Sequence, residues 1–487
     1  RGYTMLKEAE ILKFIQDDNL STKKQNARIG AEYYEGEHEI RNYKLFYYDS
    51  DGNLVEDKTR SNIKISHPFF TELVDQETQY MLGATDGFIK SDLPELQSEL
   101  DAYFNDNEDF TSELSEVVTG SITKGFEYMY AYKDVNGKIA FQCADSIGVV
   151  EVRARDTDDA TEYVIYWYVD RIDKGNKLIK RIQVWSAQDT TFYVQVEDGK
   201  LELDKAQKIN PRPHIMYHKP NDPATYYEGF GFIPFFRLDN NRKQVSGLKT
   251  IKALIDDYDL MSCGLSNNLQ DASEYLVVVS GFQGDSLDEL ITNTKTKKHI
   301  GVETGGNVDF KTVNVPYDAR KAKLELDEKN IYRFGMGFNS AQLGDGNITN
   351  IVIKSRYALL DLKCNKLEIR LKQFLRKIIK VVLDEVNTEK ETDYQMKDVY
   401  FDFQREVMTN AQDNAMIEKT DVEKQQIQIN TLLSLTTTLG DELVIQNICD
   451  ALDLDYDDIK GKIPEKVDPM MEMGALTSDL SAIQIEE

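Results

Sequence analysis

Apolar residues recur every three or four positions in the middle of the chain, the spacing typical of a helix that buries one face. The pattern predicts one helix of about 40 Å that ends near residue 272 and another of about 50 Å after residue 350. Residues 317–337 show a weaker pattern, typical of a helix that lies between neighbours. The apolar positions of the two stronger helices are Val245, Leu248, Ile251, Leu254, Ile255, Tyr258, Met261, Leu265 and Leu269, then Ile351, Tyr357, Leu360, Cys364, Leu367, Leu371, Phe374, Ile378 and Val382.

Alternating apolar and polar residues, rich in aromatic side chains, predict strands elsewhere. Gly305-Gly306 separates two of the predicted strands, and Asn136-Gly137 is a typical hairpin turn between two others. The predicted strands cover 127–132, 139–143, 148–153, 162–170, 179–186, 191–196, 298–302, 308–313 and 398–403. We therefore expect an α+β fold in which a β-rich region packs on helices.

The remaining segments predict further helices and connections. Helices are expected at 5–35, 66–82 and 410–460. Five prolines between residues 211 and 234 predict a linker that leads into the first long helix. Residues 465–487 are rich in Met and acids without a period, which predicts a disordered tail.

The chain has 85 acidic and 58 basic residues, a formal net charge of −27. Non-specific DNA binding depends on Lys and Arg that neutralise phosphates, so this balance excludes a protein that clamps DNA over its whole surface. A conduit that must not hold DNA remains compatible with it. Ten acids lie within residues 86–116, which predicts a solvated helical face or, alternatively, part of an acidic outer rim.

One segment has the opposite charge, because residues 354–380 carry nine bases and only two acids. Such a helix could form a belt that faces DNA. It could also neutralise acids on adjacent subunits of an assembly. We favour the second interpretation, because an acidic assembly must overcome its own repulsion.

No sequence motif indicates a catalytic residue, a cofactor or a metal site. The phosphate-binding string G-x-x-x-x-G-K-[ST] of a DNA-packaging ATPase does not occur, nor do HExxH and GxSxG. His214 and His218 stand four apart, but in a proline-bounded segment expected to be extended, and a zinc site needs further ligands. No apolar run reaches the ~18 residues that span a bilayer. Four widely spaced cysteines predict reduced thiols; they are Cys143, Cys263, Cys364 and Cys449.

Two stretches resemble the portal proteins of tailed bacteriophages, most closely the type found in long-tailed phages of Gram-positive hosts. The first resembles that family's stem and contains Asn240-Asn241, Leu254-Ile255-Asp256-Asp257-Tyr258-Asp259, Asn267-Asn268, Asp271-Ala272 and Leu276-Val277-Val278-Val279-Ser280-Gly281. The second resembles its tunnel loop and long kinked helix, and contains Gly346-Asn347-Ile348-Thr349-Asn350-Ile351-Val352-Ile353-Lys354 and Tyr357-Ala358-Leu359-Leu360-Asp361-Leu362-Lys363. Thr349-Asn350 replaces the Ser-Gly expected there, so the loop's hinge is expected at Gly344 or Gly346.

The resemblance implies a portal-type subunit with a β-rich and helical wing, a two-helix stem, a small α/β clip and a helical crown. The implied boundaries are 5–227 for the N-terminal wing, 228–272 for the first stem helix, 273–316 for the clip, 317–337 for the second stem helix, 338–350 for the tunnel loop, 351–409 for the long helix and the return to the wing, 410–464 for the crown and 465–487 for the tail.

The resemblance also implies a ring of about twelve copies at one capsid vertex, through which double-stranded DNA passes non-specifically during packaging and ejection. The implied partners are the terminase large subunit, the head-completion adaptor, and the major capsid and scaffolding proteins, with no membrane. The protein would be a virion component assembled in the cytoplasm of the bacterial host, and not an enzyme.

Three sets of residues are implied as functional in such a ring. The tunnel loop would approach DNA through polar groups and one acid: Asn339, Ser340, Gln342, Asp345, Asn347 and Thr349. Stem and clip bases would make weak, salt-screened contacts with phosphates, unless they are merely solvated: Arg320, Lys321, Lys323, Lys329, Arg333, Lys295, Lys297 and Lys298. The basic helix would contact adjacent subunits through Lys354, Arg356, Lys363, Lys366 and Arg370.

Two other classes of protein remain as alternatives. One is a different structural component of a phage particle, such as a baseplate or tail protein, which would assemble without an axial channel. The other is a metal-dependent nucleic-acid enzyme that uses some of the many acids, although no convincing carboxylate pair can be named.

Overall fold

A computed structural model describes residues 6–58, 60–83, 87–153, 161–173, 177–218, 224–271, 276–284, 286–293, 300–311, 316–339, 350–403, 405, 424, 426–434 and 440–451. It confirms the α+β class. The chain divides into two units: the first comprises residues 1–345 and 354–407, and the second comprises 346–353 and 408–487.

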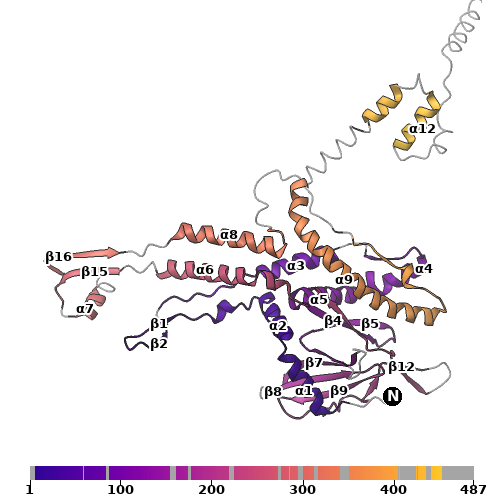
Figure 1. Cartoon of the computed structure of the whole chain (residues 1–487), viewed down its shortest axis with the longest axis horizontal. Coiled ribbons are helices and arrows are strands. Elements are labelled where there is room, and N and C mark those ends of the chain that lie inside the picture. The colour runs from indigo at the N-terminus through magenta and orange to yellow at the C-terminus, as the bar shows by residue number, and fades with distance from the viewer. Residues whose placement is uncertain are drawn as a thin grey trace, which may run out of the picture. The chain divides into compact units, whose positions relative to one another are not determined.

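Helices form much of the first unit (Figure 1). They are α1 (Glu8–Asn19), α2 (Thr22–Tyr34), α3 (Phe69–Leu82), α4 (Pro94–Leu100), α5 (Glu108–Lys124), α6 (Lys252–Asp271), α7 (Leu287–Thr292), α8 (Tyr317–Gly335) and most of α9 (Asn350–Lys390). The single helix predicted at 5–35 is two helices, because Ser21 accepts a hydrogen bond from the backbone of Lys24 and starts α2. The helix predicted at 66–82 is confirmed as α3.

The strands of the first unit form small antiparallel sheets. They are β1 (Phe46–Tyr48), β2 (Leu54–Glu56), β3 (Ile89–Lys90), β4 (Phe126–Lys133), β5 (Ile139–Ala144), β6 (Val149–Arg153), β7 (Thr161–Asp173), β8 (Lys177–Trp185), β9 (Asp189–Val196), β10 (Glu202–Leu203), β11 (Arg212–Pro213), β12 (Ile215–His218), β13 (Thr225–Glu228), β14 (Phe235–Asp239), β15 (Leu276–Phe282), β16 (Val302–Lys311) and β17 (Tyr400–Phe401). The largest sheet has the order β10-β9-β8-β7-β6, with β11 also paired to β9. The six strands predicted between residues 127 and 196 are confirmed as β4 to β9.

The segment 211–234, predicted as a linker, is largely part of the fold. Arg212 and Pro213 pair with β9. Four residues of β12 pair with β13, and β14, directly after the segment, pairs with β4. The prediction was wrong because Pro213 stands in the short strand β11 and Pro211 and Pro234 directly precede strands, where a missing N–H costs little.

The core of the first unit lies between α3, α5, α9 and the three-stranded sheet β14-β4-β5. Helix α5 packs on all three strands of this sheet, and its side chains Leu114, Val117 and Val118 are fully buried. A second cluster forms where Ile11 of α1 covers the large sheet. These layers hold the bases of α6 and α8, since Ile255 and Ile331 belong to the first core.

Two predicted boundaries in this part of the chain differ from the structure. The first helix, predicted from Val245, begins at Lys252, because Ser246 caps a separate 3-10 turn, Gly247–Thr250. Gly305-Gly306 lies inside the single strand β16 and does not separate two strands. A Cβ on Gly306 would lie 2.6 Å from the backbone oxygen of Ser280, so glycine permits close approach to β15.

The helix predicted after residue 350 is confirmed as α9, with Leu371, Ile378 and Ile379 fully buried. Strand β17 pairs with β3, as expected for a chain that rejoins the N-terminal layers. In the second unit, the described part contains α12 (Asp441–Ala451) and helical residues 426–434. The predicted tail, 465–487, lies outside the described residues.

Candidate functional site

Helices α6 and α8 lie side by side and form a rod whose far end carries β15 and β16 (Figure 1). The ammonium of Lys323 in α8 bonds to Asp257 of α6 and to Asp327 of its own helix. These two hydrogen bonds raise the pKa of Lys323. Asp257 of α6 meets Lys323 of α8, and Gly264 of α6 lies beside Arg320 of α8, so the two helices run antiparallel. We call this pair the α6–α8 rod.

Burial along the rod is concentrated toward its base. Ile255, Asp259 and Cys263 are the buried residues of α6, and Asp327, Ile331, Tyr332 and Gly335 are those of α8. Large apolar side chains farther out, and some near the base, are about half exposed; they are Leu260, Leu269, Tyr317, Leu326 and Phe334. The described part of the chain therefore leaves much of the rod uncovered.

An extended segment, residues 61–67, runs along α6. The backbone N–H groups of Ser61 and Ile63 donate to the side chains of Asp271 and Asn267, at 3.3 and 2.7 Å. The N–H groups of Ile65 and His67 donate to Cys263 and Asp259, at 3.2 and 3.0 Å. Every second residue of this segment thus meets every fourth residue of α6. The spacings match because two extended residues advance about 6.6 Å and four helical residues about 6 Å. We call this segment the strap.

A buried carboxylate lies where the strap ends. Oδ2 of Asp259 lies 2.6 Å from Nδ1 of His38, and Oδ1 lies 2.7 Å from Nδ1 of His67. Burial acts to raise the pKa of Asp259, but the hydrogen bonds from both histidines outweigh it, so the pKa is lowered. This cluster was not predicted from the sequence, although the acid within the apolar stripe of α6 is a signal for it.

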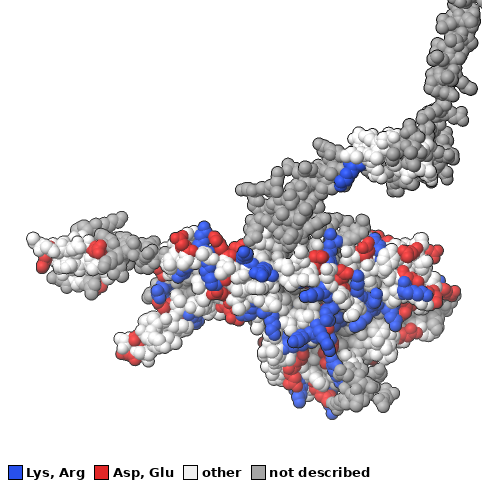
Figure 2. All heavy atoms as spheres, turned by 45° about the horizontal axis from the view of Figure 1, so that its top comes forward, with Lys and Arg blue, Asp and Glu red and all other residues white. Residues whose placement is uncertain are grey.

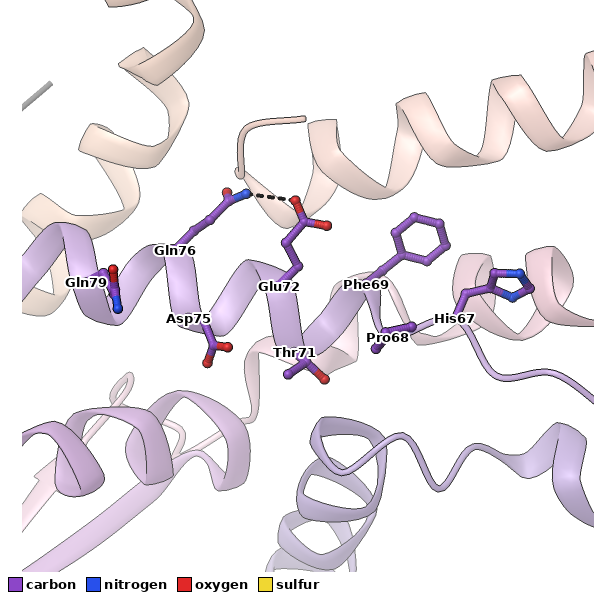
Figure 3. Close-up of a pocket in the computed structure, with 8 residues that line it drawn as sticks. All are labelled: His67, Pro68, Phe69, Thr71, Glu72, Asp75, Gln76 and Gln79. Carbon is purple, nitrogen blue, oxygen red and sulfur yellow. Dashed lines mark hydrogen bonds between the residues drawn. The ribbon is translucent and has the colours of Figure 1, made fainter. Parts of the chain in front are cut away.

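A cleft of about 650 Å³ lies along α3 near the base of the rod (Figure 3). Figure 3 shows Gln76 donating a 3.1 Å hydrogen bond to Glu72. The lining residues are His67, Pro68, Phe69, Thr71, Glu72, Asp75, Gln76 and Gln79. No group of three or more His, Cys, Asp or Glu among the described residues could hold a metal ion.

The end of α8 is fixed to α3 at the point where the tunnel-loop prediction begins. The side chain of Gln76 donates to the backbone oxygen of Phe338 at 2.7 Å and accepts from its N–H at 2.9 Å. A Cβ on Gly337 would lie 2.0 Å from a methyl carbon of Leu73, so a larger residue there would displace this buried side chain. Asn339, which is buried, donates to Glu328 at 2.8 Å. The other predicted loop residues lie outside the described residues; they are Ser340, Gln342, Asp345, Asn347 and Thr349.

The predicted stem bases differ in their surroundings. Lys323 is neutralised by two acids of its own chain, and Lys321 lies 3.9 Å from Glu325. Lys329 and Arg333 are exposed and form no ion pair within the described part of the chain. Figure 2 shows Lys and Arg mixed with Asp and Glu along the rod. Lys295, Lys297 and Lys298 lie outside the described residues.

The basic helix α9 is partly neutralised within its own chain. Lys363 lies 2.7 Å from the buried carboxylate of Glu77, which differs from the expectation that it pairs with an adjacent subunit. Lys366 and Arg370 form no ion pair within the described ranges. Lys354 and Arg356 lie in the first turns of α9, where the structure describes the helix alone.

All four cysteines are free, as predicted. Burial raises the pKa of Cys364 to about 12, so this thiol is not a nucleophile near neutral pH. Among the described residues, no helix is both long enough and apolar enough to traverse a bilayer.

Comparisons with known proteins agree with this architecture. The family model described as "Phage portal protein, SPP1 Gp6-like" matches residues 12–450. The portal protein of Bacillus phage SPP1 is 27% identical over 351 residues, which cover 71% of this chain and 67% of the relative. The portal protein of Clostridium phage phiCD119 is 24% identical over 409 residues, covering 78% of this chain and 85% of the relative. Neither relative supports a baseplate protein, a tail protein or an enzyme. The chain therefore belongs to the SPP1 Gp6-like family of phage portal proteins, which are structural components of the virion at a capsid vertex.

Proposed function

We propose that about twelve copies of this chain close into a ring at one capsid vertex and form the channel for double-stranded DNA during packaging and ejection. The observation that supports this most directly is the uncovered α6–α8 rod. A two-helix rod with half-exposed leucines and aromatic residues is stabilised when neighbouring copies cover it. Head-to-tail contacts that close by rotation give each copy the same pair of neighbours.

The subunit would be organised as the resemblance implies. Residues 5–227 form the wing, 228–272 and 317–337 the stem, 273–316 the clip, 338–350 the tunnel loop, 351–409 the long helix with its return, and 410–464 the crown. The antiparallel pair β15–β16 at the end of the rod supports a small clip.

The bases that best suit the channel are Lys329 and Arg333, because both are exposed and neither is neutralised within the described part of its chain. Repeated in each copy, they would form rings of positive charge in an otherwise acidic wall. Contacts of this kind with phosphates are weak and screened by salt, so DNA would slide. The tunnel loop would add polar contacts through Asn339, Ser340, Gln342, Asn347 and Thr349, with Asp345 opposing tight binding.

On α9, Lys354, Arg356, Lys366 and Arg370 would neutralise acids on adjacent copies. This role follows from the net charge of −27 on each chain, since copies that carry it repel one another. The implied partners are the terminase large subunit and then the head-completion adaptor at the clip, with the major capsid and scaffolding proteins around the ring. Assembly would take place in the cytoplasm of the bacterial host.

Negative-stain electron microscopy of the purified protein tests the ring. We expect annular top views with a central hole and side views that taper to a stalk. A monomer at every concentration, also with the capsid and scaffolding proteins present, would contradict the proposal.

For the channel bases, Lys329→Ala with Arg333→Ala should change the DNA content of particles while rings still form. An unchanged DNA content would remove these residues from the proposal.

A further inference from the structure

The hairpin of β1 and β2 exposes apolar side chains on both of its faces. Its register pairs Tyr48 with Leu54 and Tyr47 with Val55. Tyr48 is 73% exposed and Leu54 is 59% exposed. A lone two-stranded hairpin is at best marginally stable in water, so this one is expected to gain stability from a surface that covers it.

The strap holds this hairpin near the outer end of the rod. Ser61, which follows the hairpin closely, bonds to Asp271 in the last turn of α6. In Figure 1 the hairpin lies on the α6 side of the rod, with α8 on the other side. The two sides of one rod therefore present different surfaces, as a head-to-tail contact between identical copies requires.

A matching surface occurs at the same level of the rod. The register of α6 and α8 places Leu269 and Tyr317 at the outer end, and they are 54% and 51% exposed. Lys321, one turn farther along α8, is also exposed. The tip of the hairpin carries Asp49 and Asp51, whose charge is opposite to that of Lys321.

We propose that the hairpin packs against the outer end of the α6–α8 rod of a second copy of the chain. The proposal rests on the ring proposed above, with the rods running along its axis. Rotation about that axis does not move any residue along the axis. The hairpin of one copy therefore lies at the same height as the outer end of the rod of its neighbour. Leu54 and Tyr48 then cover Leu269 and Tyr317, and the tip acids lie near Lys321. This places Lys321 in a subunit contact and leaves the channel to Lys329 and Arg333.

A disulfide cross-link tests the contact directly. We expect a chain that carries both Leu54→Cys and Tyr317→Cys to form a ladder of covalent oligomers when rings are oxidised, as seen on a non-reducing gel. Each single variant should form none, because three of the native cysteines are buried and Cys143 is partly buried. Rings that form normally but give no ladder would overturn the contact.

Substitution in the hairpin tests its contribution to assembly. Tyr48→Ser with Leu54→Ser should raise the concentration at which rings form by at least tenfold, which corresponds to about 1.4 kcal/mol. The matched control is Val135→Ser, which changes a fully exposed apolar residue in the turn between β4 and β5. Mass photometry gives the assembly state, and circular dichroism shows whether each variant is folded.

The outcomes separate this inference from the proposed function. If the unchanged protein forms rings and the hairpin variant forms them equally well, the hairpin contact is wrong and the ring stands. If the unchanged protein forms no rings, the proposed function fails. If the hairpin variant forms no rings and is unfolded, the disulfide cross-link between Leu54→Cys and Tyr317→Cys decides whether the contact exists. If Tyr48→Cys reacts with maleimide as fast in rings as in monomers, no copy covers the hairpin and the inference fails.

Discussion

At the scale of single residues, the base of the rod depends on a few buried polar groups. Asp259 is 0% exposed and accepts hydrogen bonds from two histidines that lie about 200 residues away in the chain. The acid itself interrupts the apolar stripe of α6, but its histidine partners are too far away in the chain to leave a local pattern, so the sequence predicted α6 without them. A buried charge without partners is unfavourable, so the three residues depend on one another.

Asp259→Asn should lower the free energy of unfolding by about 3 kcal/mol, because it removes a charged acceptor and leaves the buried His38 and the partly buried His67 with a weaker partner. Thermal unfolding at neutral pH measures this effect. The control is Glu325→Gln, an exposed acid 3.9 Å from Lys321, which should change stability by less than about 1 kcal/mol. Equal effects of both substitutions would show that the cluster contributes little.

Glu127 in β4 predicts a dependence on pH. Burial raises the pKa of this carboxyl to about 7, although Lys124 beside it acts in the opposite direction. A carboxyl whose folded pKa lies above its unfolded value stabilises the fold below the unfolded value, and this stabilisation is lost as the pH rises toward the folded value.

The free energy of unfolding should therefore fall by about 2–4 kcal/mol between pH 4.5 and pH 8 through this residue. Glu127→Gln should remove most of that fall, whereas Glu202→Gln on the exposed edge strand β10 should keep it. Urea titrations at several pH values measure how the free energy of unfolding depends on pH. If this dependence is the same in Glu127→Gln as in the unchanged protein, the Glu127 carboxyl is ionised throughout the range.

At the scale of elements, periodicity predicted the long helices and the six main strands, because each buries one face over many residues. It did not predict the start of α6, where the capping bond of Ser246 overrides the apolar pattern. It also did not reveal the strap, whose hydrogen bonds run from backbone to side chains and follow no apolar period. Of the candidate site, the rod and α9 were predicted, while the intrachain partners of Lys323 and Lys363 depend on the packing of separate helices.

Asn267→Ala should loosen the strap, because the N–H of Ile63 loses its acceptor. We expect amide exchange in residues 61–67 to become at least tenfold faster, which corresponds to about 1.4 kcal/mol of local stability. Hydrogen–deuterium exchange with mass spectrometry measures it. Asn268→Ala, one position along α6, is the matched control, and faster exchange in both variants would contradict a specific role for Asn267.

At the scale of the whole molecule, the net charge of −27 sets the main electrostatic problem of assembly. Copies at close distance repel one another, and the exposed bases of α9 are the largest local excess of opposite sign. The chain belongs to the portal family, and under the proposed function the same negative charge would weaken its contacts with DNA phosphates.

Lys366→Glu with Arg370→Glu should raise the concentration needed for rings by at least tenfold at low salt, and by less at high salt, where charges are screened. The unfolding temperature of the monomer should change little, because neither side chain forms an ion pair within the described residues. Sedimentation velocity at two salt concentrations measures the ring-forming concentration, and circular dichroism on heating measures the unfolding temperature. The control is Lys205→Glu on an exposed turn. An equal rise of the ring-forming concentration in that variant would show that net charge alone causes the effect.

The match between strap and helix has a mechanical consequence. The acceptors on α6 stand four residues apart and end at Asp259; the next position along the same line is Ile255, whose side chain accepts no hydrogen bond. Sliding α6 by one helical turn in that direction would bring a backbone amide opposite a hydrocarbon, which costs about 1–3 kcal/mol. The strap therefore opposes sliding of α6 in that direction, and a force acting that way along the rod should tilt or rotate it before it slides.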